Sequence, residues 1–261
     1  MIVLIMAGGL GKRMESDLPK VLHNVNVPNY PSIYNITYPM IIHVILKAIT
    51  INPTKIYIIV GKYKDIIKDT IDKYINLNII TNSELIEYVY QGESLGTGHA
   101  ILCALPQIAD YINDSALILS GDVPLISENT LTNLIDDENK LLITRLNNPT
   151  GCGRIIMDNK NGIINIIEEK DCSLTEKMIK LVNCGIYQIK VKDLLKLIPQ
   201  IGNNNNAKEY YLTDIITLMI NNNIKIGYYE LPEVKQYEIT NINTKHDLDK
   251  LNRYIINMNS N

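Results

Sequence analysis

The sequence contains no phenylalanine and no tryptophan, so tyrosine supplies every aromatic ring among its 261 residues. It also lacks a long apolar run, since nothing approaches the roughly 18 consecutive apolar residues that suggest a membrane-spanning helix. The apolar start, Met1 to Met6, is too short for the apolar region of a secretory signal and has no basic flank before it. We therefore expect a cytoplasmic protein with no membrane partner.

Excess positive charge is also missing. The chain has 25 Lys and Arg against 28 Asp and Glu, a net charge of −3. The chain therefore lacks the excess of basic residues that is typical of nucleic-acid-binding proteins, and nucleic acid is not an expected partner. The four cysteines form no Cys-x-x-Cys pair and no dense framework, which favours reduced thiols over disulfides. Because the net charge is slightly negative, any binding of phosphate must depend on a local cluster of basic residues.

The first part of the chain, to about residue 140, alternates apolar strand-like runs with helical patterns. The expected strands cover residues 2–6, 55–60, 77–80, 86–90 and 116–120, and the expected helices cover 40–50, 63–74 and 98–108. Strands that are apolar throughout and separated by helices are typical of a parallel sheet covered on both faces. With right-handed crossovers, this predicts a doubly wound, Rossmann-like α/β fold.

The pattern changes after about residue 140. Asn161-Gly162 between two apolar or alternating runs indicates a β-hairpin, and residues 181–189 resemble another strand. Residues 209–220 have helical spacing with Thr213 as a candidate N-cap, and a closing helix is expected over about 244–257. We predict a mixed, mostly parallel sheet over 1–140, an antiparallel lobe over 141–243 and a C-terminal helix over 244–261.

A glycine-rich loop follows the first predicted strand, in the stretch "MAGGLGKRM". It is not a P-loop, because Met6 replaces the first glycine and Arg13 the Ser or Thr, and Met14 replaces the third glycine of a dinucleotide fingerprint. Glycines at 8, 9 and 11 let backbone N–H groups approach a ligand closely. The nearby basic residues, Lys12, Arg13 and Lys20, suit phosphate. A plain strand-to-helix turn with solvated charges explains the loop equally well.

Two further signals lie at strand ends. Asp122 follows an apolar strand and a glycine, where a carboxylate suits Mg²⁺, although a cap of the Gly-Asp-x-Pro turn explains it as well. Glu168 and Glu169 end another strand, either to bind a hydroxylated ligand or as a solvated pair on a hairpin. Ligands of parallel sheets bind beyond the carboxyl ends of strands, so these positions favour a site.

The stretch 91–98 combines an amide with glycines. Gln91 carries a side-chain amide that can donate to and accept from a base edge at once. Gly96-Thr97-Gly98 precedes a helix, whose N-terminus favours anions and leaves N–H groups free, although Thr97 acting as a plain helix cap is the alternative. Taken in chain order, the glycine loop suits phosphate, the amide suits a base and the strand-end Asp suits a metal. The polar strand ends of the second half then suit a second substrate. Nucleotidyl transfer to a phosphate monoester needs this set, because the attacking oxygen is already anionic and positioning carries the catalysis.

The opening "MAGGLGKRM" resembles the L-A-[AG]-G-x-G-T-R-[ML] signature of sugar-1-phosphate nucleotidyltransferases. Narrower matches follow at 16–23, 93–100, 121–127, 149–155, 166–171, 182–187 and 204–216. Together they resemble the uridyltransferase domain of bacterial N-acetylglucosamine-1-phosphate uridyltransferase. That family transfers UMP from UTP to N-acetylglucosamine-1-phosphate with Mg²⁺, forming UDP-N-acetylglucosamine and pyrophosphate, so the resemblance implies the same reaction and substrates here.

The resemblance also implies roles for individual residues. The expected nucleotide-binding residues are Met6, Ala7, Gly8, Gly9, Gln91, Gly96, Thr97, Gly121 and Asp122. Arg13 and Lys20 are expected to stabilise charge on the phosphates, and Asp122 and Asn243 to hold Mg²⁺. The expected sugar-binding residues are Gly153, Glu168, Asn183, Tyr211 and Thr213.

The chain departs from the family pattern at several positions. These are Lys12 for Thr, Ser94 for a second Gln, Ser120 for a larger residue, Cys184 for Thr and Asn241 for Gly. Residues 25–38 resemble an insertion that forms a surface loop. The β-helix that acetylates glucosamine-1-phosphate in the bacterial enzyme has no counterpart, so we expect no acetyltransferase activity and leave the oligomeric state open.

Three alternatives stay open at this point. One is a nucleotidyltransferase for another sugar-1-phosphate, such as glucose-1-phosphate. Another is a non-catalytic relative that binds nucleotide sugars, which would be expected to lose Arg13, Lys20 or Asp122, although all three are present. The third is a glycosyltransferase that uses a UDP-sugar, but the Asp-x-Asp pair typical of its strand end is missing.

Overall fold

The computed structural model describes residues 1–9, 11, 14, 16–28, 35–240, 242, 244, 246–249 and 251. Its strands are β1 (Ile2–Met6), β2 (Asn24–Pro28), β3 (Asn35–Pro39), β4 (Lys55–Val60), β5 (Ile86–Tyr90), β6 (Ser115–Ser120), β7 (Lys140–Arg145), β8 (Arg154–Met157), β9 (Ile163–Ile167), β10 (Leu181–Lys190) and β11 (Gly227–Glu230). Its α-helices are α1 (Met40–Thr50), α2 (Lys64–Asn76), α3 (Thr97–Ile108), α4 (Glu128–Leu134), α5 (Val191–Leu197) and α6 (Asp214–Asn221).

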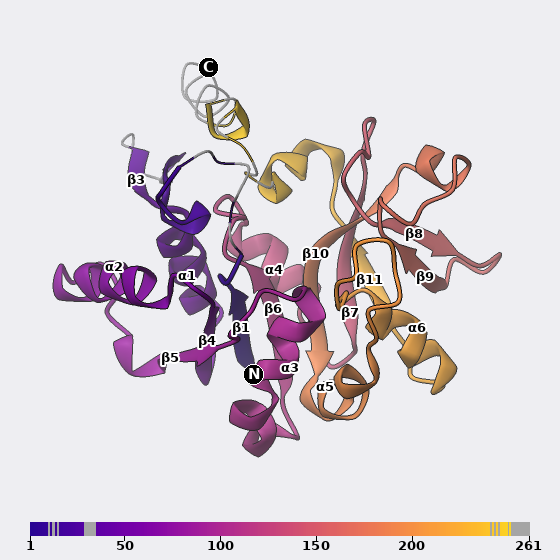
Figure 1. Ribbon diagram of the computed structural model, residues 1–261, viewed down its shortest axis with the longest axis horizontal. Coiled ribbons are helices and arrows are strands. Elements are labelled where there is room, and N and C mark those ends of the chain that lie inside the picture. Colours follow the sequence, from indigo (N-terminus) through magenta and orange to yellow (C-terminus); the bar gives the residue numbers. More distant parts are fainter. Residues whose placement is uncertain are drawn as a thin grey trace.

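One large sheet organises the molecule. Its strands follow the order β11-β7-β10-β6-β1-β4-β5, which runs across Figure 1 from right to left. Neighbours β6, β1, β4 and β5 are parallel, as are β7 and β11, and only β10 on this path runs against the others. The predicted mixed, mostly parallel sheet is therefore confirmed.

Helices cover both faces of this sheet, because its central strands are apolar along most of their length. In β1, Val3 and Ile5 face a core closed by α1, α2 and α4. Ile2 and Leu4 point the other way, into a core closed by α3, α5 and α6. All four side chains are fully buried, and each such burial stabilises the fold by about 1.5–3 kcal/mol. The structure is thus the doubly wound arrangement that the sequence predicted.

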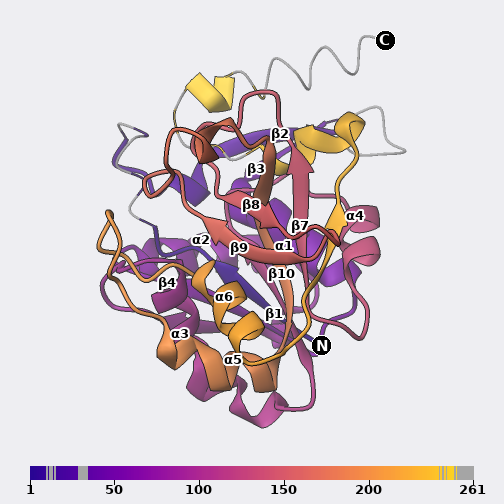
Figure 2. The same ribbon diagram turned by 90° about the vertical axis from the view of Figure 1, so that its right-hand side faces the viewer.

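The second half of the chain adds antiparallel strands to the same sheet. The predicted hairpin is confirmed, since β8 and β9 pair antiparallel around a connection in which Asn161 has φ of 60°. The Asp158 carboxylate accepts hydrogen bonds from the backbone N–H groups of Lys160 and Gly162 and holds that turn. In Figure 2 this hairpin faces the viewer, and α6 packs against β9.

The predicted strand over 77–80 is wrong, because these residues complete the end of α2. Asn78 adopts a left-handed φ of 54°, and the N–H groups of Ile79 and Ile80 both donate to the carbonyl of Tyr74. This is a helix-terminating turn in which a left-handed residue lets late N–H groups satisfy helical carbonyls. Ile80 is buried. The apolar run therefore anchors the turn to the core and does not enter the sheet.

The expected surface loop over 25–38 is in part a second, small sheet. β2 and β3 pair antiparallel, with Asn24 opposite Pro39. Val25 is fully buried with Met40, and its carbonyl lies 3.0 Å from Nε2 of His43. Of the expected closing helix, residues 246–249 and 251 are helical, and most of the remainder lies outside the described residues. No described helix has the length and apolar character needed to cross a bilayer.

Candidate functional site

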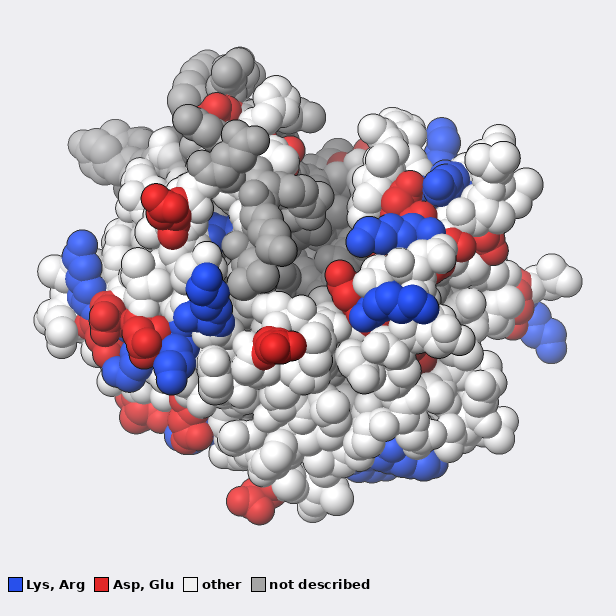
Figure 3. Space-filling view, in the orientation of Figure 1, with Lys and Arg blue, Asp and Glu red and all other residues white. Residues whose placement is uncertain are grey.

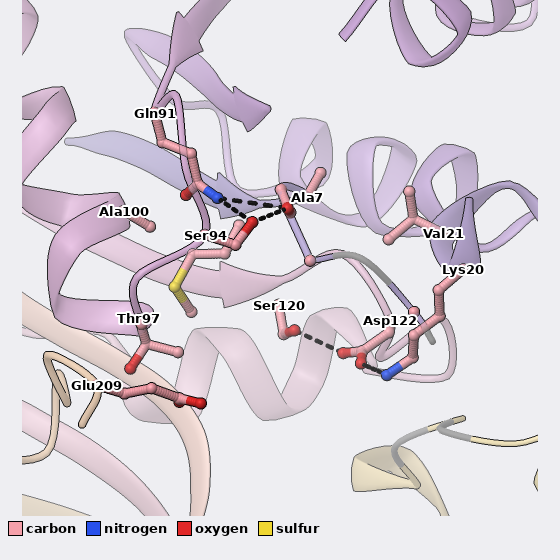
Figure 4. Close-up of a pocket in the computed structure, with 15 residues that line it drawn as sticks. Ala7, Lys20, Val21, Gln91, Ser94, Thr97, Ala100, Ser120, Asp122 and Glu209 are labelled. Carbon is pink, nitrogen blue, oxygen red and sulfur yellow. Dashed lines mark hydrogen bonds and ion pairs between the residues drawn. The ribbon is translucent and has the colours of Figure 1, made fainter. Parts of the chain in front are cut away.

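The glycine loop lies where β1 ends, between β4 and β6, and it forms one wall of a cavity of about 530 Å³. Figure 3 shows this face of the molecule hollowed between its two halves, and Figure 4 shows the lining side chains. The lining residues are Met6, Ala7, Gly8, Gly9, Gly11, Lys20, Val21, Gln91, Ser94, Gly96, Thr97, Ala100, Ser120, Asp122 and Glu209. Strand ends of the parallel sheet thus converge on one hollow, as expected for this fold.

Gln91 packs directly onto the glycine loop. A Cβ placed on Gly8 would lie 2.3 Å from Nε2 of Gln91, so a larger residue at this position would have to displace the Gln91 amide. The amide donates to the Gly8 carbonyl at 3.3 Å and to the Ser94 hydroxyl at 3.1 Å. Ser94 in turn donates to the same carbonyl at 2.7 Å. Ser94 was noted only as a departure from the family pattern, and its bonds to the Gly8 carbonyl and to Gln91 place it in the site.

An ion pair crosses the floor of the same cavity. The Lys20 ammonium contacts Oδ2 of Asp122, and each side chain is only 14% exposed. Ser120 donates a hydrogen bond of 2.5 Å to Oδ1 of the same carboxylate. Gly121 lies between them, and its N–H donates to the Met6 carbonyl at 2.9 Å. The strand ends of β1 and β6 therefore hold this carboxylate in a fixed position beside a cation (Figure 4).

The turn Gly96-Thr97-Gly98 is fastened to a segment from the other half of the chain. Gly98 N–H donates to the Tyr210 carbonyl at 2.8 Å, and Tyr210 N–H donates to the Leu95 carbonyl at 2.9 Å. The Thr97 hydroxyl accepts from Leu212 N–H at 3.0 Å and makes no cap bond to α3. The Gly98 N–H is therefore bonded within the protein, and Thr97 is not the capping residue, since Gly96 holds the N-cap position of α3. A segment from the other half of the chain thus contacts the start of this helix.

A second cavity of about 170 Å³ adjoins the first, and Met6 and Thr97 line both. Its other lining residues are Gly151, Cys152, Gly153, Glu168, Asn183, Cys184, Gly185, Tyr187, Leu212 and Thr213. Four of the five expected sugar-binding residues are in this set. The fifth, Tyr211, lines a further cavity of about 480 Å³, which Glu168 also lines.

A β-bulge shapes the wall of the second cavity. The register of β10 against β7 shifts between Asn183 and Tyr187, and Gly185 within this step has φ of 72°. Asn183 donates to the Tyr187 hydroxyl at 2.6 Å and accepts from Gly185 N–H at 3.0 Å. Burial, and next the charge of Glu168, raise the pKa of Tyr187. Bulges commonly re-aim side chains beside functional sites, and this one turns Asn183 toward the cavity.

Glu168 is the acidic residue of the second cavity. Its Oε1 accepts a hydrogen bond of 2.9 Å from Thr213, so the Thr213 hydroxyl does not cap α6 as expected. Burial raises the pKa of Glu168, and the carboxylates of Asp214 and Asp171 raise it further against the effect of Thr213. A partly desolvated carboxylate is a strong hydrogen-bond acceptor for hydroxyl groups.

Glu169 has a structural partner instead. It pairs with the buried guanidinium of Arg154 at 2.5 Å and accepts from Gly151 N–H at 3.1 Å. Burial acts to raise the pKa of Glu169, but these hydrogen bonds and the Arg154 charge outweigh it and lower the pKa. Arg154 also donates to the Cys152 carbonyl. This pair therefore fixes the loop that bears Gly153 and is not directed at a ligand.

Most of the expected site residues meet in these two cavities. Gly121 is the expected nucleotide-side residue that supports the first cavity without lining it. Arg13 and Asn243 lie outside the described residues. Glu209, Ser94, Ser120 and Tyr187 line the cavities but were not among the expected site residues. Only Ser94 and Ser120 had been noted, as departures from the family pattern.

Comparison with known sequences shows the family of the chain. The Nucleotidyl transferase family model matches residues 2–234. A protein of Acanthamoeba polyphaga mimivirus named "Probable UDP-N-acetylglucosamine pyrophosphorylase" is 46% identical over 258 residues, which cover 95% of this chain and 93% of that protein. Bifunctional protein GlmU of Legionella pneumophila strain Philadelphia 1 is 37% identical over 260 residues. That match covers 96% of this chain and 51% of GlmU, so the chain spans about half the length of this relative.

A solved structure shows the same fold. A protein from Bacillus anthracis that carries the name glucose-1-phosphate thymidylyltransferase superposes with a TM-score of 0.65 at 20% identity. The superposition covers 98% of this chain and 95% of the other. The family model and both sequence relatives extend along nearly the whole chain, and the site groups a glycine loop, an amide and a lysine–aspartate pair in one hollow. The chain belongs to the nucleotidyl transferase family.

Proposed function

We propose that this protein transfers UMP from UTP to N-acetylglucosamine-1-phosphate, forming UDP-N-acetylglucosamine and releasing pyrophosphate. The observation that carries the proposal is the contact between the two cavities, which share Met6 and Thr97 as a common wall. One cavity has the groups for a nucleoside triphosphate and the other has hydrogen-bonding groups for a sugar. The names of the mimivirus and Legionella relatives agree with this substrate pair.

In this proposal the residues to about 140 bind UTP. Backbone groups of Met6 to Gly9, with Gly96, Thr97 and Gly121, surround the nucleotide, and Gln91 reads uracil. Lys20 and Arg13 stabilise negative charge on the phosphates as it shifts toward the leaving pyrophosphate. Residues from about 141 to 243 bind the acceptor, with Gly153, Glu168, Asn183, Tyr211 and Thr213 around the sugar.

Asp122 is proposed to hold Mg²⁺ together with the substrate phosphates. The site suits a cation, because the carboxylate already has the Lys20 ammonium as its partner and Ser120 orients it. Mg²⁺ is usually bound by one or two carboxylates plus substrate phosphates, so a single Asp can serve as a ligand here. Asn243, the second proposed ligand, lies outside the described residues. When bound, Mg²⁺ neutralises charge on the phosphates.

The chemistry requires positioning more than proton transfer. An anionic phosphate oxygen of the acceptor attacks the α-phosphorus of UTP, a P–O bond forms, and the bond to the departing pyrophosphate breaks. The nucleophile is already deprotonated, so no general base is needed. The protein's part is to hold both phosphates in line, which the shared wall of the two cavities favours.

The decisive test is pyrophosphate release with Mg²⁺, using each common nucleoside triphosphate against three acceptors. These acceptors are the 1-phosphates of N-acetylglucosamine, glucose and N-acetylgalactosamine. We expect efficient release only with UTP and N-acetylglucosamine-1-phosphate. Release with another pair would overturn the base or sugar assignment. Nucleotide-sugar binding without release would favour a non-catalytic binding role.

Acceptor binding is expected to weaken at acidic pH because of Glu168. Since its pKa is raised, this carboxylate takes up a proton at a higher pH than an ordinary glutamate and then accepts fewer hydrogen bonds. The KM for the sugar phosphate should rise by about tenfold as Glu168 becomes protonated. The control is Glu168→Gln, which keeps the titration of the substrate phosphate but loses that of Glu168. An identical acidic limb in both proteins would contradict the role of Glu168.

A further inference from the structure

The Ser94 hydroxyl links the side chain of Gln91 to the glycine loop at the wall of the first cavity (Figure 4). Ser94 Oγ donates to the Gly8 carbonyl at 2.7 Å, and Nε2 of Gln91 donates both to Ser94 Oγ at 3.1 Å and to that carbonyl at 3.3 Å. Three polar groups thus form a closed triangle. Gln91 is only 6% exposed, so water has little access to its amide, although Ser94 itself is exposed.

The triangle has a fixed polarity. A backbone carbonyl only accepts, so the Ser94 proton is committed to Gly8 and Ser94 turns a lone pair toward Gln91. Rotating the Gln91 amide by half a turn would place Oε1 beside the Gly8 carbonyl, and the single Ser94 proton could then satisfy only one of these two acceptors. The Gly8 carbonyl faces Gly61, where a side chain would crowd it, since a Cβ at Gly61 would lie only 2.8 Å from the carbonyl oxygen. The amide is therefore locked with Nε2 toward the protein.

We infer that Ser94 is a positioning residue that selects the base through Gln91. With Nε2 held, the group that Gln91 offers to a ligand is Oε1, which accepts no hydrogen bond within the described part of the chain. A fixed acceptor pairs with a ring N–H donor, such as N3–H of uracil. It repels a ring nitrogen that carries a lone pair, such as N3 of cytosine. This inference rests on the proposed function, because it takes UTP as the nucleotide.

The test compares Ser94→Ala and Ser94→Thr with wild type and with Ser83→Ala. Ser94 is exposed, so alanine opens no cavity in the core, and threonine keeps the hydroxyl. Ser83 is an exposed serine outside the site and serves as the matched control. For each protein, kcat and KM are measured with UTP, CTP and 3-methyl-UTP, whose base lacks the N3–H donor, at saturating N-acetylglucosamine-1-phosphate.

Wild type should prefer UTP strongly over both analogues. In Ser94→Ala the ratio of kcat/KM for UTP to that for CTP should fall by about tenfold, mainly through KM, because one of the two acceptors that orient the amide is gone. Ser94→Thr should restore the ratio, and Ser83→Ala should match wild type. A merely structural role for Ser94 would change the rates with all nucleotides together and leave the ratio unchanged.

An unchanged UTP to CTP ratio in Ser94→Ala would overturn the inference, as would efficient use of 3-methyl-UTP by wild type. Failure of the proposed function is a separate result, namely no pyrophosphate release by wild type with UTP. In that case calorimetric binding of UTP, CTP and 3-methyl-UTP to the same four proteins tests Ser94 directly. The expected and contradicting ratios are then those of the dissociation constants.

Discussion

Replacing Asp122 by alanine is expected to lower kcat for UDP-N-acetylglucosamine formation by about a thousandfold or more, since metal-ion stabilisation of a phosphoryl transition state contributes several kcal/mol. Asp122 is the carboxylate that the strand ends of β1 and β6 bring to the floor of the first cavity, between Ser120 and Lys20. Its loss removes the proposed Mg²⁺ ligand and one partner of Lys20. The measurement is the steady-state rate across a Mg²⁺ titration.

A matched control separates this effect from the loss of an ordinary ion pair. Asp72→Ala breaks the pair of Lys68 with Asp72 on the exposed surface of α2. Surface pairs of this kind contribute about 0–1 kcal/mol, so this variant should keep both wild-type activity and the wild-type melting temperature. Asp122→Ala should also remain folded. A kcat within tenfold of wild type would show that Asp122 does not hold the metal.

The fold could be predicted largely because its central strands carry an unmistakable pattern. Residues such as Ile2 to Met6 are apolar at consecutive positions, which only a sheet covered on both faces requires. The glycine loop and Asp122 then follow at strand ends, and the parallel topology alone brings them together. Chain order and sheet topology thus bring the glycine loop and Asp122 to one cavity, whereas the contribution of Glu209 from the second half of the chain was not expected.

The errors share one physical cause, which is that local patterns do not reveal long-range partners. Thr97 and Thr213 lie at helix starts and look like caps, but their hydroxyls bond Leu212 N–H and Glu168. Residues 77–80 look like a strand but end a helix. The contacts of Gly98 with the Tyr210 backbone cannot be foreseen, because a carbonyl carries no side-chain signature. Such backbone contacts join the walls of the two cavities. The sequence therefore predicted many residues of each cavity, but not the contact that joins the cavities.

The contact between the Gly96 turn and the Tyr210 backbone leads to the second prediction with a large expected effect on activity. Replacing Gly96 by alanine should lower kcat/KM for the acceptor by about a hundredfold. A Cβ at Gly96 would lie 2.4 Å from the Tyr210 carbonyl oxygen and 2.7 Å from its nitrogen, and both are backbone atoms that cannot rotate away. The φ of 128° adds strain of about 1–3 kcal/mol. The segment after Tyr210, which carries Leu212 and Thr213 of the second cavity, must therefore shift.

Gly92→Ala is the control that isolates this contact from backbone strain. Gly92 lies in the same loop with φ of 66°, but a Cβ there would meet nothing within 4 Å. Its replacement should cost about 1–2 kcal/mol of stability through the left-handed backbone alone and leave the acceptor KM near wild type. A positive-φ glycine is thus replaced in both variants, and only Gly96→Ala displaces the Tyr210 segment. Equal losses in acceptor kcat/KM would show that strain, rather than contact between the two segments, limits the reaction.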